Sequence, residues 1–362
     1  MFPGNNTCEG FYSFYHNMIN FPADRVFILK GGPGVGKSTL MKKIGSVLVR
    51  RGYDLEYHYC SSDNESLDGL VIPVLRMAIL DGTSPHIVDP KSPGAVEAIV
   101  NLGDFCDEPY LRQRKERIIE LSKQKAKMFS LAYSHLKEAK LVQDELESYQ
   151  QEALDIVGVR KLLFLIRESV FSNIAPQFMK QAKVRRLFAS ANTAAGYVNY
   201  FDSILEEARK LYLLRGEIGT GKEGFLKAIY HEGVNRGLDC EVYHCPFQPQ
   251  RIELLFFPQI AVGFLRIDEP LEYEPFNLQE LHDSRDLDFS SFLKKKELLL
   301  YQQEKKEAQT RLQFLRKQAW DKLKIAKVYH DQLEKQYLPA MNFEAIDQKR
   351  EELMGKILSS LV

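Results

Sequence analysis

The stretch RVFILKGGPGVGKSTL, residues 25–40, decides the fold class of this chain. Its apolar part at residues 26–29 predicts a buried strand, and apolar residues recur at helical spacing from Leu40 to Leu48. A glycine-rich loop lies between them. A strand, a glycine-rich loop and a helix in this order are typical of a phosphate-binding site, because the loop's backbone N–H groups and the positive end of the helix both face the anion.

The loop fits the pattern G-x-x-x-x-G-K-[ST], which ends here in Lys37 and Ser38. In such a loop the lysine contacts the outer phosphates and the hydroxyl group binds Mg²⁺. We therefore predict that Lys37 is catalytic and that the loop binds ATP. A glycine-rich turn without a ligand would leave the Lys-Ser pair unexplained. The nucleotide-binding residues that we expect are Gly31, Gly32, Pro33, Gly34, Val35, Gly36, Lys37, Ser38 and Thr39.

A second residue that organises the metal is expected at the end of a neighbouring buried strand. Residues 77–80 are continuously apolar, as in a buried parallel strand, and Asp81 follows them. We predict that Asp81 and Ser38 bind Mg²⁺ and that Asp81 takes part in catalysis; the alternative is an Asp in a glycine-containing turn. His86 and Asp89 lie beyond it. They either contact a γ-phosphate or an acceptor, or serve turn geometry.

A weaker copy of the motif, RGEIGTGKEG, lies at residues 215–224. It has Glu223 where a Ser or Thr is expected. An offset of 185 residues places its lysine on Lys37 and its first glycine on Gly31, so the match is not accidental. The expected phosphate-binding residues of this copy are Gly216, Gly219, Gly221 and Lys222.

The repeat extends beyond the two loops. Residues 132–147, AYSHLKEAKLVQDELE, match residues 319–334, AWDKLKIAKVYHDQLE, at an offset of 187. Self-similarity over this length indicates a tandem duplication. We predict a first unit at residues 1–185 with an intact nucleotide site and a helical arm, and a second, degenerate unit at residues 186–362 with its own arm.

Each half resembles a P-loop NTPase domain, and the whole chain is similar to the tandem P-loop ATPase proteins of bacteria. The segments DGTSPHIVDP at residues 81–90 and NTCEGF at residues 6–11, which recurs as NTAAGY at residues 192–197, add to this resemblance. It covers nearly the whole chain. It implies an α/β fold of two tandem P-loop NTPase domains, each a parallel sheet flanked by helices, and it implies nucleotide binding.

Both metal-organising positions differ in the second unit. The offset of 185 places Glu223 on Ser38 and Arg266 on Asp81. An isolated Glu beside phosphates would be repulsive and an isolated buried Arg would be costly, whereas the two together could form an ion pair in the space of a lost metal. We therefore predict a Glu223–Arg266 pair and poor magnesium binding at the second loop.

A rival interpretation starts from FLRIDEP, residues 264–270, which resembles an apolar strand ending in Asp-Glu. In many ATPases such a pair supplies the metal ligand and the catalytic carboxylate. Asp268 and Glu269 would then be active, and the second site would work. The gap-free offset opposes this interpretation, because it places Asp268 opposite Thr83 rather than opposite Asp81.

The segments that follow are expected to be helical. Residues 108–151 contain no Gly and no Pro after Pro109, and apolar residues recur at spacings of three and four. They predict a long amphipathic helix of about 60 Å. Apolar residues at 159–171 predict its return, so we expect a helical hairpin, or lid, on each core. The apolar stripe favours packing within the chain; the alternative is a nucleotide-driven lever or coiled-coil arm that binds a protein partner.

Composition narrows the function further. Lys plus Arg and Asp plus Glu each number 49, so the net charge gives no signal for nucleic acid or for a membrane. No apolar run is long enough for a membrane span and the N-terminus lacks the features of a signal peptide, so we expect a cytoplasmic protein. Five cysteines without C-x-x-C spacing do not suggest a zinc site or a disulfide framework.

These features together predict an ATP-binding protein, a slow Mg²⁺-dependent ATPase that uses the first loop, with a structural or regulatory second unit. No Glu follows Asp81, so the usual water-activating carboxylate is missing there. Two alternatives stay open. One is a small-molecule kinase of the nucleotide type, with an unknown acceptor beneath the helical arm. The other is a nucleotide-gated interaction protein without significant turnover, whose arms contact a protein partner.

Overall fold

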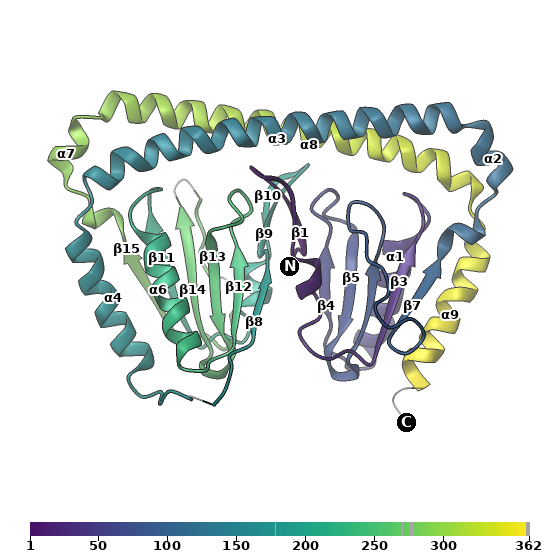
Figure 1. Cartoon of the computed structure of the whole chain (residues 1–362), viewed down its shortest axis with the longest axis horizontal. Helices are drawn as coiled ribbons and strands as arrows, with labels where there is room; N and C mark the ends of the chain where they lie inside the picture. Colours follow the sequence, from purple (N-terminus) through teal and green to yellow (C-terminus); the bar gives the residue numbers. More distant parts are fainter. Residues whose placement is uncertain (178, 269–270, 276–277, 360–362) are drawn as a thin grey trace.

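Two α/β lobes stand side by side beneath an arch of two long helices (Figure 1). The computed structural model describes residues 1–177, 179–268, 271–275 and 278–359. Parallel strand pairs lie in both sheets, which confirms the α/β class expected from the sequence. Within these ranges, no helix combines the length and the apolar character that crossing a bilayer requires.

The first lobe contains a five-stranded sheet. Its order is β4 (Glu56–Tyr59), β5 (Leu67–Ile72), β6 (Met77–Asp81), β3 (Arg25–Lys30) and β7 (Glu97–Asn101). β3 runs parallel to β6 and β7, whereas β5 is antiparallel to β4 and β6. Helix α1 (Lys37–Arg50) follows β3 and buries one face at helical spacing, as the sequence predicts, through Leu40, Met41, Ile44 and Leu48.

The second lobe repeats this order with one strand added at an edge. Its sheet runs β15 (Asp283–Asp288), β11 (Lys210–Gly216), β14 (Val262–Asp268), β13 (Ile252–Phe257), β12 (Cys240–His244) and β8 (Val184–Leu187). β11 is parallel to β14 and β15, as β3 is to β6 and β7. Helix α6 (Lys222–Asn235) follows β11 as α1 follows β3. The strand order therefore follows the sequence repeat.

Two short hairpins meet between the lobes. They are β1 (Gly4–Thr7) with β2 (Gly10–Ser13), and β9 (Ser190–Thr193) with β10 (Gly196–Asn199), which the short helix α5 (Phe201–Ile204) follows. The Asn5 side-chain amide donates to the Ser190 carbonyl at 2.8 Å, and that of Asn192 donates to the Asn6 carbonyl at 3.0 Å. These bonds satisfy buried amides that would be costly to leave unpaired.

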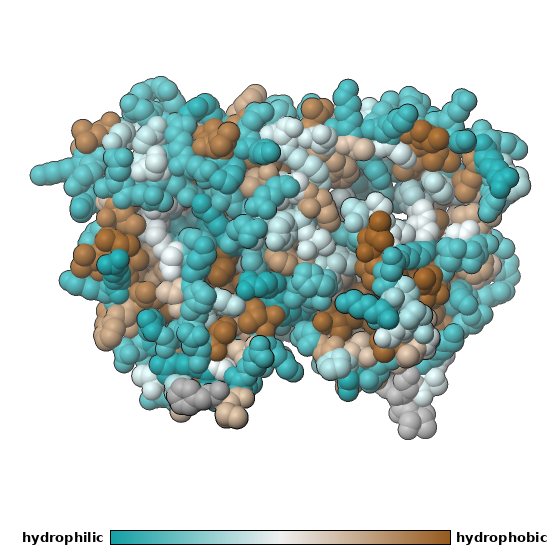
Figure 2. Space-filling view, in the orientation of Figure 1, coloured by the Kyte–Doolittle hydropathy of each residue, from teal (hydrophilic) through white to brown (hydrophobic). Residues whose placement is uncertain are grey.

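The arch consists of α3 (Lys115–Glu152) and α8 (Gln302–Tyr337), which run antiparallel to each other. The short helices α2 (Glu108–Gln113) and α7 (Lys295–Leu299) precede them, and α4 (Ile156–Phe171) and α9 (Phe343–Ser359) follow them. Figure 2 shows mostly hydrophilic side chains along the arch. Its apolar stripe is buried within the chain through Leu136, Ala139, Val142, Leu146, Ala308, Leu312 and Ala319.

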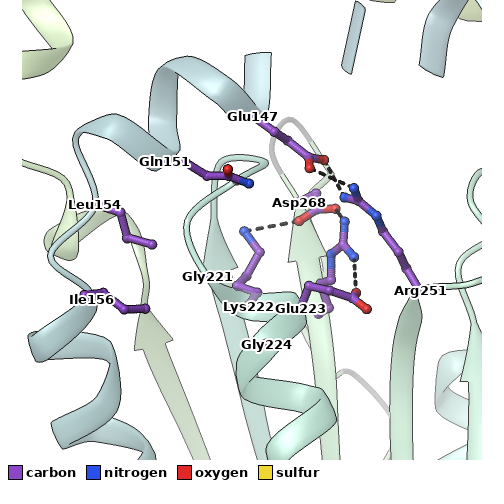
Figure 3. A pocket seen from close by; sticks show the side chains of 12 residues that line it. Glu147, Gln151, Leu154, Ile156, Gly221, Lys222, Glu223, Gly224, Arg251 and Asp268 are labelled. Atoms are coloured by element: carbon purple, nitrogen blue, oxygen red, sulfur yellow. Dashed lines mark hydrogen bonds and ion pairs between the residues drawn. The ribbon is translucent and has the colours of Figure 1, made fainter. Parts of the chain in front are cut away.

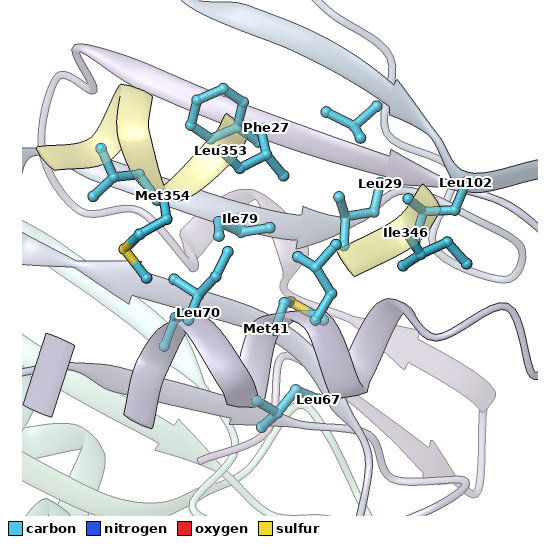
Figure 4. Packing of buried hydrophobic residues seen from close by; sticks show 14 of the residues in the cluster. Phe27, Leu29, Met41, Leu67, Leu70, Ile79, Leu102, Ile346, Leu353 and Met354 are labelled. Atoms are coloured by element: carbon cyan, nitrogen blue, oxygen red, sulfur yellow. The ribbon is translucent and has the colours of Figure 1, made fainter. Parts of the chain in front are cut away.

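The helix that follows each arch helix packs on the lobe formed by the other half of the sequence. Helix α9, at the end of the chain, covers the first sheet (Figure 4). Its Leu353 and Met354 belong to the same buried cluster as Phe27, Met41 and Ile79. Helix α4, from the first half, packs in the same way against α6 of the second lobe. The buried core of each lobe therefore contains residues from both halves of the sequence.

This exchange corrects two expectations from the sequence. The arms pair with each other rather than forming a hairpin or lid on their own cores, and the ranges 1–185 and 186–362 delimit the repeat but not the folded cores. The reason is length. The 38 residues of α3 span about 57 Å, and only residues 153–155 separate its end from α4. The chain therefore reaches the far lobe before it can turn.

Because α9 packs into the first lobe, we predict that it stabilises the core of that lobe, although it lies far from it in the sequence. Leu353→Ala should lower the free energy of unfolding by about 2–5 kcal/mol, because Leu353 is 1% exposed and its truncation leaves a cavity. The matched control is Leu165→Ala on α4, where the side chain is 62% exposed, and it should change stability by less than about 0.5 kcal/mol. Denaturant titration measures both; equal effects would contradict the exchanged packing.

Candidate functional site

The first glycine-rich loop, residues 31–39 (loop 1), joins β3 to α1. Gly36 caps α1 with a φ of 88°, a left-handed conformation that favours glycine. Gly31 has a φ of 143°, and a Cβ atom there would lie 2.8 Å from the Val35 side chain. Because α1 begins at Lys37, the N–H groups of its first turn have no partner within the helix and are available to an anion.

Lys37 is folded back over loop 1. Its ammonium group donates to the carbonyls of Gly31 at 2.8 Å and Gly32 at 2.9 Å. Its Nζ lies 3.6 Å from Oδ2 of Asp81, at the end of β6. The fold therefore brings together two of the residues that the sequence assigns to one site, although they are far apart in the chain.

The expected metal ligands have the right chemistry for Mg²⁺. The Ser38 hydroxyl oxygen accepts a hydrogen bond from the Leu67 N–H at 3.0 Å, and Oδ1 of Asp81 accepts one from the Thr83 N–H at 2.9 Å. These bonds orient a hydroxyl and a carboxylate, which are the oxygen donors that Mg²⁺ prefers alongside water. Within the described residues, no three His, Cys, Asp or Glu side chains cluster as an alternative metal site.

A cavity of about 1500 Å³ lies between loop 1 and the arch. All nine residues 31–39 line it, as does Asp81. Its other walls come from the β1–β2 hairpin and from the two arch helices. Small-molecule pockets typically measure about 300–1,000 Å³, so this cavity has room for a nucleotide and for more.

The second half of the chain closes the first site. A Cβ atom on Gly34 would lie 3.2 Å from the Cβ atom and carbonyl oxygen of Glu334 on α8, and one on Gly32 would lie 2.8 Å from the Tyr337 ring. Glycine at these two positions thus permits the close approach of α8. A hydrogen bond from His330 is the main reason why the pKa of Glu334 lies below its usual value. The site is therefore a composite of both halves.

The two further candidates have different positions. His86 lines the cavity, and its Nε2 lies 3.3 Å from Oδ2 of Asp68, with both side chains 6% exposed. The imidazole ring stacks on Tyr15 at a centroid distance of 4.2 Å. Asp89 is instead exposed and pairs with Lys30 at 3.3 Å. The fold thus places His86 in the wall of the cavity, whereas Asp89 forms an exposed ion pair with Lys30.

The second loop, residues 216–224 (loop 2), is crossed by ion pairs (Figure 3). Lys222 is buried, donates to the Glu217 carbonyl at 2.6 Å and lies 3.1 Å from Oδ1 of Asp268. Arg266 contacts both Asp268 and Glu223. Gly219, Gly221 and Lys222 line the adjacent cavity, which measures about 400 Å³. Gly216 is buried at the end of β11.

The Glu223–Arg266 pair is present, with 3.4 Å between Oε2 and Nη1. Strand pairing supports the gap-free offset, because Arg266 pairs with Leu214 as Asp81 pairs with Leu29. Arg266 is nevertheless shared with a second carboxylate.

Asp268, from the rival interpretation, also faces loop 2. Burial alone would raise the pKa of its carboxyl, but attraction to Arg266 and Lys222 holds that pKa well below its usual range. A carboxylate thus remains beside the lysine of loop 2, two residues further along the strand than in the first lobe. Glu269, the other residue of the rival, lies outside the described residues.

Side chains from α3 and α8 occupy much of the space above loop 2. Glu147 pairs with Arg251 at 2.7 Å, and Lys305 pairs with Glu217 at 2.6 Å. Arg316 donates to the Gln143 side chain at 3.0 Å. Each of these cations thus has an acceptor within the protein.

Glu253, which the offset of 185 matches to Asp68, is a buried acid of the second lobe. It accepts hydrogen bonds from the Ser190 and Tyr197 hydroxyl groups. Burial is the main reason why its pKa is raised to about 7, and the hydrogen bonds and Arg266 oppose this rise. The position of Asp68 is thus kept as an acid in both lobes, but it is held by hydroxyl donors in the second.

Comparisons with protein-family models, with curated proteins and with solved structures found no match for this chain. The site is therefore judged by its own geometry.

Sequence reasoning missed the residues that the arms bring to each loop. Glu147 and Glu334 had a visible signal, because they are the identical last residues of the two matching arm segments. Asp68 and Glu253 had one too, as acids at equivalent positions. These signals could not be assigned while each arm was expected on its own core.

Glu253 predicts a pH dependence of stability. Folding raises the pKa of Glu253 from 4.5 to about 7, because the buried carboxyl group favours its neutral form. The stability that this neutral form contributes to the folded protein is fully present below pH 4.5 and is lost as the pH rises through 7. Relative to Glu253→Gln, which cannot ionise, the wild-type protein should lose about 3 kcal/mol of unfolding free energy over this range. Denaturant titrations at several pH values measure the difference. Parallel profiles for the two proteins would contradict a raised pKa.

Proposed function

We propose that the chain is a tandem P-loop NTPase that binds Mg²⁺ and ATP at loop 1 and hydrolyses ATP slowly. The observation that carries this proposal is the asymmetry between two similar lobes. Lys37, Ser38 and Asp81 line a cavity of about 1500 Å³, whereas the matching positions of the second lobe surround one of about 400 Å³ crossed by ion pairs. An open polyphosphate site is therefore supported in the first lobe.

The residues of loop 1 would each contribute a separate step. The N–H groups at the start of α1 bind phosphate oxygens, and Lys37 exchanges its carbonyl acceptors for the outer phosphates. Ser38 and Asp81 would hold Mg²⁺, which supplies positive charge against the phosphates. The charge that develops on the transferred phosphoryl group is then stabilised by donors already in position. The Lys37 side chain is the part of the loop that has to change its contacts.

The second lobe is proposed to serve a structural or regulatory role. Arg266 occupies the strand position that corresponds to Asp81, and Glu223 occupies that of Ser38. A cation in place of a carboxylate repels Mg²⁺. The backbone of loop 2 remains anchored through Lys222, so the lobe can hold α3 and α4 without a ligand.

A small-molecule kinase is the second candidate, and the size of the cavity favours it. The volume beneath the arch exceeds that of a typical pocket for one ligand, and the buried Asp68–His86 pair lines its wall. An acceptor with a hydroxyl group would fit beside the nucleotide. Turnover that depends on such an acceptor would distinguish a kinase from an ATPase, and nucleotide binding without turnover would instead support a nucleotide-gated interaction protein.

Substitution of the equivalent lysines, one in each loop, tests which loop binds and hydrolyses ATP. Lys37→Ala should weaken Mg²⁺-dependent ATP binding by about tenfold to a hundredfold and abolish phosphate release, because a charge-assisted bond to phosphate contributes about 1.5–3 kcal/mol. Lys222→Ala is the matched control at loop 2 and should retain both activities. Calorimetry and a phosphate-release assay measure them. Normal activity in Lys37→Ala, with loss in Lys222→Ala, would reverse the assignment.

A further inference from the structure

Lys125 of α3 is a cation without an ion-pair partner among the described residues of the first lobe. It lines the same cavity as loop 1, on a face of α3 that also carries Ser122, Phe129 and Tyr133. The side chain is half-buried, and it has no hydrogen bond or ion pair with any of the residues that the structure describes. Two other arch lysines that line this cavity are paired, Lys327 with Asp63 at 3.8 Å and Lys140 with Asp144, and a third, Lys137, is exposed rather than half-buried.

The charges around Lys125 favour an anion in front of it. Burial is the main reason why its pKa is lowered, and repulsion from Lys37 lowers it further, against the opposing effects of Cys60 and Glu334. The ammonium groups of Lys37 and Lys125 thus act on the same cavity, one from loop 1 and one from the arch. An anion between them would offset both the burial cost and the repulsion.

The second lobe lacks this cation. The offset of 187 that aligns the arms places Leu312 at the position of Lys125, and Leu312 is buried in the seam of the arch. The loop lysine itself has a carboxylate neighbour in both lobes, at 3.1 Å between Lys222 and Asp268 and at 3.6 Å between Lys37 and Asp81. A lysine at this position of the arch therefore occurs above loop 1 and not at the equivalent position above loop 2, where the arch cation Arg316 donates to the Gln143 side chain instead.

We propose that Lys125 is a second phosphate ligand, which binds the terminal phosphate of a nucleoside triphosphate held at loop 1. This inference rests on the proposed function. Lysine at the end of a phosphate-binding loop contacts the outer phosphates, so in the proposed complex the terminal phosphate lies between Lys37 and Lys125, which line the same cavity. The arch then selects triphosphates over diphosphates.

Nucleotide titrations test this selectivity. Wild-type protein and three variants are titrated by calorimetry, in the presence of Mg²⁺, with ADP and with a non-hydrolysable ATP analogue. Lys125→Ala should weaken binding of the ATP analogue about tenfold or more and change ADP binding less than about twofold. Lys125→Arg should restore most of the selectivity. The matched control is Lys123→Ala, an exposed lysine on the same helix, which should bind both nucleotides as the wild type does.

The outcomes separate this inference from the proposed function. Unchanged analogue binding in Lys125→Ala, or equal losses for both nucleotides, would overturn the role of Lys125 while leaving loop 1 as a nucleotide site. If the wild-type protein binds neither nucleotide, the proposed function fails, and inorganic triphosphate and pyrophosphate are titrated instead. Triphosphate binding that depends on Lys125 would support the cation site without the nucleotide, and failure of both anions to bind would overturn it.

Discussion

The antiparallel seam between α3 and α8 is the contact on which the rest of the structure depends. Each helix begins beside one lobe and ends beside the other, so their buried apolar faces set the distance between the two loops. The connections that follow α3 and α8 are short, so α4 and α9 pack into the core of the lobe that each arch helix has reached. Because apolar burial is the main favourable term in folding, the seam and both exchanged helices are expected to form together. Each lobe is then incomplete without the other half of the chain.

Within this shared frame the two lobes balance charge differently. Above loop 2, Lys222, Arg251 and Arg266 each face a carboxylate of the protein, so these three charges are compensated internally. Removing one partner of such a pair is costly, because it leaves the other charge buried and uncompensated. Above loop 1, Lys37 and Lys125 both line an open cavity, and Lys125 has no ion-pair partner within the described residues. Under the proposed function a bound polyphosphate would supply negative charge there, which links the asymmetry of the cavities to that proposal.

The local patterns of the sequence predicted the α/β class, the strand-loop-helix units and the strand position of Asp81, because these depend on short stretches of chain. The Glu223–Arg266 pair also followed from the repeat alone. The place of the arms did not, because an amphipathic stripe indicates that a helix is buried but not against which partner. Lys125 and Glu334 belong to the candidate site only through that long-range packing. From the sequence, Asp268 was expected at the site only in the rival interpretation. In the structure its carboxylate contacts Arg266, which also contacts Glu223, and a linear alignment does not reveal this arrangement.

The number of nucleotides bound per chain tests the central claim, that one open site and one internally compensated site occupy the same framework. Calorimetric titration of the wild-type protein with a non-hydrolysable ATP analogue and Mg²⁺ measures this number directly. The account predicts one magnesium-dependent nucleotide per chain. Two equivalent binding events would show that loop 2 also works, and the absence of any would show that the cavity above loop 1 serves another ligand.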